Sequence, residues 1–188
     1  MTKRDAICDA ALELFAERGI EATTIRDIAQ RADAAEGTLY RHFKGKDELA
    51  GWLYRRCAQE LQSRLVDATQ PATLPEEKLE ALIRGVFDFF QDRPTSCTYL
   101  LSNRSEKIGG DGQASAASAP PLGFFVEVIE EGQSEGRFQD EEAALVAGWI
   151  LAMVQRTVLF LKSGTLDASR PSAIDRTVQG ALRLIAID

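Results

Sequence analysis

Apolar residues recur at helical spacing along most of the chain. The first such set is Ile7, Ala11, Leu14 and Phe15. These positions stand at i, i+4, i+7 and i+8, the spacing of one helix face, and predict a helix from about residue 3 to residue 18. Gly19 follows as the residue that ends it. The chain therefore opens with an amphipathic helix of about four turns.

Two short helices and a tight turn are predicted next. Thr24 is expected to cap a helix that ends near Ala32, with Asp27 at its third position completing a capping box. The segment 33–35 leaves room only for a tight turn, and residues 36–43 then make about two helical turns before Gly45. This order of elements is a helix-turn-helix.

The rest of the chain is also predicted to be helical. Leucines at four-residue spacing predict a long helix from Lys46 to Thr69, and no alternating strand pattern follows. Residues 105–121 are rich in Gly, Ser, Ala and Pro and predict a mobile surface loop. Further helices are expected over about 79–93, 95–104, 125–132, 143–162 and 174–185.

The fold class is therefore all-α, with two expected domains. Residues 1–48 are expected to form the helix-turn-helix domain, whose fourth helix continues to about residue 69. Residues 49–188 are expected to form a helical regulatory, ligand-binding and dimerisation domain.

A helix-turn-helix can present its second helix to the DNA major groove. Leu39 and Phe43 are expected to point back to the core, so the residues between them face outward. The candidate DNA contacts are Thr24, Arg26, Glu36, Gly37, Thr38, Tyr40, Arg41, His42 and Lys46. Phosphate contacts are assigned to Thr24, Tyr40, His42 and Lys46, and base reading to Glu36, Gly37, Thr38 and Arg41. The Glu36 carboxylate either accepts a hydrogen bond from cytosine or repels phosphate.

The net charge of −7 over 188 residues at first opposes a nucleic-acid partner. Its distribution is more favourable, because residues 18–46 hold six cations and four acids, a local +2. The alternative is a three-helix packing unit whose aromatic residues are core and whose charges are merely solvated.

The joint spacing resembles the TetR family of regulators. The matching residues are Thr24, Ile28, Ala29, Ala32, Gly37, Thr38, Leu39, Tyr40, His42, Phe43, Lys46 and Leu49. The resemblance implies an all-helical regulatory domain that binds a small molecule and dimerises through its last two long helices, and it implies a repressor. The family commonly has Gly-Val-Ser where this chain has residues 33–35, which removes a capping bond of about 1 kcal/mol. Asp33 or Glu36 is expected to compensate in part.

Aromatic and polarizable side chains in the second domain are candidates for an effector pocket. The candidate ligand-binding residues are Phe87, Phe90, Tyr99, Phe124, Phe125, Trp149, Met153, Arg156 and Phe160. For each one alone, plain core is the simpler interpretation; as a set they favour a hydrophobic or aromatic effector. Arg156 faces either that pocket or a partner subunit. The apolar run 143–161 is interrupted by Gln155 and Arg156, which favours a buried or dimer-forming helix over a membrane span.

The remaining signals argue against catalysis. A single histidine, with no P-loop, HExxH or GxGxxG motif, leaves little basis for an enzyme, and no cofactor or metal is expected. Cys8, Cys57 and Cys97 are interpreted as core residues, with a redox-sensing pair as the alternative. No signal peptide is evident, so a cytoplasmic location is expected. A helical interaction module without DNA binding is the second alternative, and a small helical enzyme the third.

Overall fold

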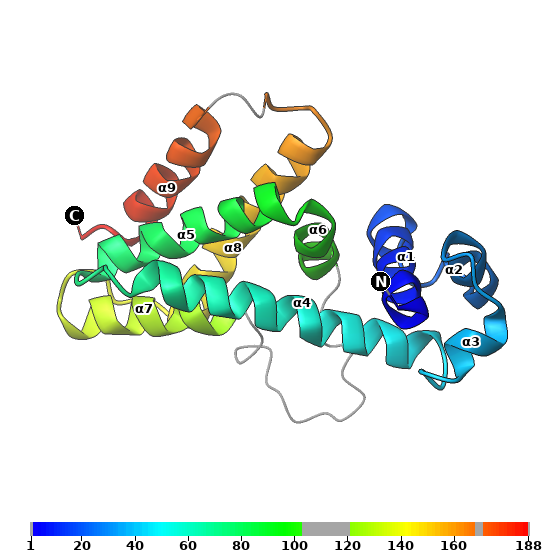
Figure 1. The fold of residues 1–188 in the computed structure, drawn as a ribbon. Coiled ribbons are helices and arrows are strands. Elements are labelled where there is room, and N and C mark those ends of the chain that lie inside the picture. Colours follow the sequence, from blue (N-terminus) through cyan, green and yellow to red (C-terminus); the bar gives the residue numbers. More distant parts are fainter. Residues whose placement is uncertain (1, 103–120, 168–170, 188) are drawn as a thin grey trace. The chain divides into compact units, whose positions relative to one another are not determined.

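The computed structural model describes residues 2–102, 121–167 and 171–187, and over these ranges the chain is helical with no strand (Figure 1). The helices are α1 (Lys3–Arg18), α2 (Ile25–Arg31), α3 (Glu36–Tyr40), α4 (Lys46–Thr69), α5 (Pro75–Asp92), α6 (Pro94–Ser102), α7 (Leu122–Ser134), α8 (Ala143–Lys162) and α9 (Pro171–Ile185). The all-α prediction is confirmed. The loop predicted over 105–121 lies outside the described residues except for Pro121, the N-cap of α7.

The chain forms two compact units. The first comprises residues 1–59 with 93–112, and the second comprises residues 60–92 with 113–188. Helix α4 begins in the first unit and continues into the second. Helix α6 belongs to the first unit, where it packs against α1, although its place in the sequence is within the expected regulatory domain.

The ends of α1 and α2 follow the sequence rules for helix caps. Thr2 and Asp5 form a capping box at the start of α1, and Thr24 and Asp27 form the predicted one at the start of α2. Gly19 has φ of +86°, and its N–H donates to the Phe15 carbonyl at 3.0 Å. Glycine adopts this positive φ without steric cost, which accounts for the end of α1 at Arg18.

The turn before α3 departs from that regularity. Asp33 adopts a φ of +47°, the left-handed region that non-glycine residues seldom occupy, although Asp tolerates it better than most. The N-cap of α3 is Ala35, which makes no side-chain capping hydrogen bond. Helix α3 then ends at Tyr40, earlier than the predicted residue 43, and the N–H groups of His42 and Phe43 both donate to the Leu39 carbonyl in the turn that follows.

The first unit has a continuous apolar core. Its members include Ile7, Ala11, Leu14, Phe15, Ile28, Leu39, Phe43, Leu49 and Leu53, all 4% exposed or less. Tyr99 of α6 stacks on Phe15 at a centroid distance of 6.0 Å, and its hydroxyl donates to the Ala50 carbonyl at 2.9 Å. The Tyr99 side chain thus contacts both α1 and α4 and helps to hold α6 against them.

In the second unit α5 packs against α7, α8 and α9. Its apolar face, which includes Leu82, Val86 and Phe87, is buried, while charged residues at its margins reach the neighbouring helices. Arg84 donates to Asp175 of α9 at 2.8 Å, and Lys78 pairs with Glu131 of α7. These pairs link α5 to α7 and α9 at the rim of an apolar core.

Helix α8 leaves much of its apolar surface open. Val146, Ile150 and Val154 are buried, but Leu145, Trp149 and Phe160 are 44%, 46% and 38% exposed. By length and composition alone, α8 is the only described helix that could cross a membrane, and 28% of its most apolar window is buried. The helix thus presents one buried face and one exposed apolar face.

Candidate DNA-binding surface

Helix α3 separates its buried residues from its exposed ones as a DNA-reading helix requires. Leu39 and Phe43 are 0% and 4% exposed, whereas Tyr40 is 56% exposed. The other outward residues are Glu36, Gly37, Arg41 and His42, which are exposed, and Thr38, which is half-buried. Apart from Thr24, Arg26 and Lys46, all the predicted DNA contacts therefore lie on or directly after one short helix.

Thr24 is exposed but its polar groups are engaged within the capping box. Its hydroxyl oxygen accepts from the Asp27 N–H at 3.1 Å, and the same hydroxyl donates to the Asp27 carboxylate at 2.7 Å. Hydrogen bonds from the Thr24 side chain and backbone hold the pKa of Asp27 below its usual range, with a smaller contribution from Arg18, 2.7 Å away. The start of α2 therefore carries a carboxylate of its own.

Lys46 is half-buried and ties the start of α4 to the loop before α2. Its ammonium donates to the Thr23 carbonyl at 2.9 Å and to the Glu21 carbonyl at 3.4 Å. An ammonium group has three donors, so one remains for an anion at the start of α4. The position fits a phosphate contact that is held in place by the protein.

The cations of residues 18–46 differ in how far their charge is already balanced. Arg31 bonds Glu13 at 3.0 Å and Glu17 at 3.5 Å, and hydrogen bonds to these carboxylates raise its pKa. Arg18 is paired with Asp27. Arg26 and Arg41 are exposed and take part in no ion pair recorded within the described ranges. Arg26, Arg41 and Lys46, the three cations predicted to contact DNA, are therefore not paired with a carboxylate among the ion pairs of the described residues.

Comparison with known proteins identifies this arrangement. The family model described as "Bacterial regulatory proteins, tetR family" matches residues 7–51, which run from α1 into α4. In residues 7–51 the chain therefore belongs to the TetR family. It is a DNA-binding transcription regulator and not an enzyme.

Two relatives show what this regulator is similar to along most of its length. It is 28% identical to the transcriptional repressor KstR2 of Mycolicibacterium smegmatis, over 87% of this chain and 81% of that protein. It is 24% identical to the transcriptional activator FasR of the same organism, over 95% of this chain and 81% of that protein. Both a repressor and an activator thus occur among its relatives.

Solved structures agree on the fold. A TetR-family regulator from Shewanella sp. PV-4 matches with a TM-score of 0.83 and 21% identity over 100% of both chains. The ketosteroid transcriptional regulator KstR2 of Mycobacterium tuberculosis matches with a TM-score of 0.71 and 25% identity, over 100% of this chain and 96% of that one.

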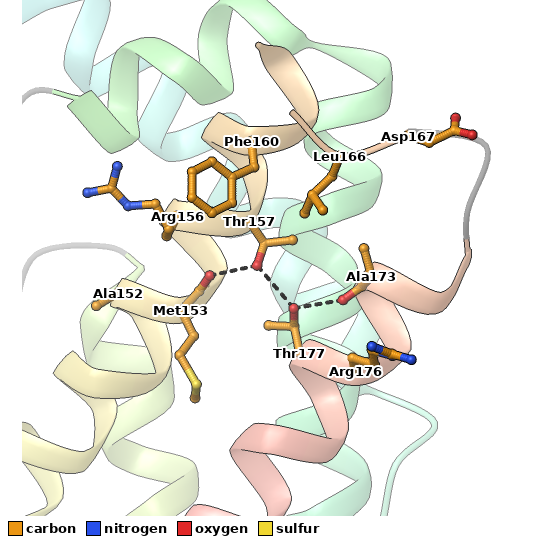
Figure 2. A pocket seen from close by; sticks show the side chains of 10 residues that line it. All are labelled: Ala152, Met153, Arg156, Thr157, Phe160, Leu166, Asp167, Ala173, Arg176 and Thr177. Atoms are coloured by element: carbon orange, nitrogen blue, oxygen red, sulfur yellow. Dashed lines mark hydrogen bonds between the residues drawn. The ribbon is translucent and has the colours of Figure 1, made fainter. Parts of the chain in front are cut away.

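The regulator has a groove of about 690 Å³ between α8 and α9 (Figure 2). Phe160 and Leu166 lie along it, while Arg156 and Arg176 lie on opposite sides. The hydroxyls of Thr157 and Thr177 are 3.1 Å apart. The groove therefore combines apolar side chains with two threonine hydroxyls, and its charged lining residues are Arg156, Arg176 and Asp167.

The predicted ligand residues do not gather in one place. Met153, Arg156 and Phe160 line the groove of α8 and α9, and Trp149 lies exposed one turn before Met153. Phe87 and Phe125 are buried and Phe90 and Phe124 half-buried on α5 and α7. Tyr99 lies in the core of the first unit.

The groove also contains residues that the sequence reasoning missed, among them Thr157, Leu166, Ala173, Arg176 and Thr177. Thr157 stands four residues after Met153, and Thr177 stands one turn after Ala173, so helical spacing alone places each pair on one face. The sequence did not show that these two faces, one on α8 and one on α9, pack against each other and form a single groove.

Proposed function

We propose that the regulator binds a palindromic operator as a homodimer in the cytoplasm, represses transcription there, and releases the DNA when an apolar small molecule binds its helical body. One observation carries the DNA part of this proposal: α3 buries Leu39 and exposes Tyr40, and Arg41 and His42 are exposed in the turn directly after it, an arrangement that suits a helix docked in the major groove.

Within that surface the two kinds of contact are divided. Four residues bind phosphates and thereby fix the position of the protein along the DNA: Thr24, Tyr40, His42 and Lys46. Thr38 and Arg41 reach base edges, where an arginine pairs best with guanine. Glu36 and Gly37, exposed at the start of α3, also face the bases. Arg26 of α2 supplies a positive charge that attracts the DNA.

The second copy covers the exposed apolar face of α8. Leu145, Trp149 and Phe160 would otherwise expose large apolar side chains to water, and the groove beside Phe160 accepts a partner's side chains. Arg156, whose guanidinium lies 5.8 Å from the Phe160 ring centroid, is then an interface residue. Two helices from each copy make a four-helix interface.

The effector is an apolar molecule held among aromatic side chains of α5 and α7, with Phe90 and Phe124 half-buried there. The relatives support this class by their names: KstR2 is called a ketosteroid regulator, and a structurally similar protein from Bacillus halodurans, with a TM-score of 0.76, is called a fatty acid degradation regulator. A steroid or fatty-acyl compound is the proposed class.

Release follows from a population shift. The effector favours a state in which α4 tilts and the two α3 helices of the dimer change their spacing. Half-sites lie about one DNA turn apart, so after a change of a few ångströms only one of the two α3 helices can still dock in its half-site.

The experiment begins with selection of bound sequences from random duplex DNA. Enrichment of a palindromic site is expected, and release of that duplex is then measured with a panel of steroids and fatty-acyl compounds. Absence of an enriched site would contradict operator binding. Turnover of a panel compound would instead favour an enzyme.

Single substitutions then separate the roles. Tyr40→Ala is expected to weaken binding to all duplexes, whereas Arg41→Ala is expected to change which sequence is preferred. Arg55→Ala, which removes an exposed cation of α4 that has no assigned role, is the control. Tyr40→Ala protein that folds and binds like the parent would remove the phosphate assignment.

The dimer has its own test. Trp149→Glu places a charge in the α8 face and is expected to give a monomer by analytical ultracentrifugation, with loss of operator binding. Val66→Glu is the matched control, because Val66 is similarly exposed, at 41%, and belongs to a different helix, α4. A dimeric Trp149→Glu protein would locate the interface elsewhere.

A further inference from the structure

Two adjacent residues at the start of α1 contact the two ends of the segment that contains α3. The Lys3 ammonium donates to the Asp33 carbonyl at 2.7 Å and lies 3.8 Å from the Asp33 carboxylate. The Arg4 guanidinium lies 5.6 Å from the ring centroid of Phe43. The residues just before and just after α3 are therefore both held by α1.

The Arg4 contact extends into α4. The same guanidinium lies 4.6 Å from the Trp52 ring centroid, and Phe43 and Trp52 lie 5.8 Å apart with their rings inclined at 58°. Arg56 approaches Trp52 from α4 at 5.6 Å. A guanidinium over two aromatic faces is attracted by both rings, so Arg4 fixes the position of Phe43 against the start of α4.

The segment between these contacts has little local structure to hold it. Helix α3 has five residues, far fewer than an isolated helix needs for stability in water. Ala35 gives it no side-chain cap, and Asp33 holds a left-handed backbone conformation. Its orientation must therefore come from contacts outside the segment.

We infer that Lys3 and Arg4 act as a brace, the α1 brace, that sets the orientation of α3 for DNA reading without themselves needing to touch DNA. This inference rests on the proposed role of α3 as the reading helix. Lys3 is 62% exposed, so its bonds add little to global stability. Removal of the brace therefore loosens residues 33–43 and leaves the rest of the first unit folded.

The first test needs no DNA. Amide hydrogen exchange is measured by mass spectrometry on the full chain, for the parent, Lys3→Met, Arg4→Met and the control Arg55→Met. Exchange over residues 33–43 is expected to become about three- to tenfold faster in the two brace variants, in line with the strength of a cation–π contact for Arg4 and of a hydrogen bond for Lys3. Exchange unchanged in this segment, or faster throughout the first unit, would overturn the brace.

The second test separates positioning from direct phosphate binding. Affinity for the selected duplex, or for random duplex if no site is enriched, is measured across salt concentrations for the parent, Arg4→Met and Arg4→Lys. Positioning predicts weaker binding in both variants, because lysine keeps the charge but not the flat guanidinium, with an unchanged salt slope. Parent-like affinity in Arg4→Lys, or a salt slope in Arg4→Met that is smaller by about 0.9, the value for one neutralised phosphate, would show that Arg4 acts as a phosphate-binding charge. Because the exchange test is made without DNA, failure of the operator proposal and failure of the brace are distinguishable.

Discussion

The hydroxyl of Tyr99 donates a hydrogen bond to the carbonyl oxygen of Ala50, 49 positions earlier in the chain, at 2.9 Å. Tyr99 is fully buried, and burial raises its pKa, so the phenol stays protonated and able to donate across the ordinary pH range. This bond joins α6 to α4, and the stacking on Phe15 joins α6 to α1.

Replacing Tyr99 by Phe removes this hydrogen bond and keeps the ring. The free energy of unfolding is expected to fall by about 1 kcal/mol, because a buried bond is removed while the Phe15 stacking survives. Urea unfolding of Tyr99→Phe measures the change. Tyr54→Phe, which alters a half-buried hydroxyl of α4, serves as the control. An unfolding midpoint equal to that of the parent would show that the bond contributes nothing net.

The missing cap of α3 can be restored. Ala35→Ser places a hydroxyl at the N-cap, where it can accept from a free backbone N–H of α3, and is expected to stabilise the protein by about 0.5–1 kcal/mol. Thermal unfolding measures the gain. Ala34→Ser makes the same chemical change one residue before the cap and should not raise stability. Equal effects of the two substitutions would argue against a capping contribution.

Gly132 is held against Phe138, which follows the end of α7. A Cβ at position 132 would lie 2.2 Å from Cδ2 of the Phe138 ring, so Gly132→Ala is expected to destabilise the protein by about 1–3 kcal/mol. Gly180→Ala is the control, since its Cβ would meet only the Met153 sulfur at 3.8 Å. The difference is measured by urea unfolding. A Gly132→Ala protein as stable as the control would mean that the Phe138 ring moves freely.

The three cysteines are buried and form no disulfide with one another, and burial raises the pKa of Cys8 to about 11 and that of Cys97 to about 12. Thiolate is the reactive form, so at about pH 8 both are expected to react with a disulfide reagent about a hundredfold or more slowly than an exposed thiol. Absorbance of the released thiol measures the rate, and all three should react at once in urea. Rapid reaction of the folded protein would revive the interpretation of a redox-sensing pair.

Helix positions were predictable because local signals agreed. Gly19, the Thr24 cap and Gly45 mark helix ends within a few residues, and each signal depends only on neighbours in the sequence. The end of α3 was less predictable, because Arg41 and His42 continue helical hydrogen bonds in a turn that no sequence signal distinguishes from a helix.

Which helices pack against each other was much less predictable. Periodicity shows which face of α6 or α8 is apolar, but not which helix covers it. Tyr99 was grouped with the ligand residues of the body, yet it packs on Phe15 of α1 in the first unit. Phe160 does line a groove, but the sequence did not show that α9 forms its other side. The contacts of Lys3 with Asp33 and of Arg4 with Phe43 join residues 30 or more positions apart in the chain and had no local signal at all.

If the proposed dimer forms through α8, the exposed apolar face of this helix links the regulator's stability to its own abundance. In the proposed dimer, burial of Leu145, Trp149 and Phe160 is part of the folding free energy, so the unfolding temperature rises with protein concentration. A regulator made in few copies would then spend longer as single chains, which are less stable and more prone to degradation. The cellular level of this protein would thus determine both how much operator it occupies and how long each chain lasts.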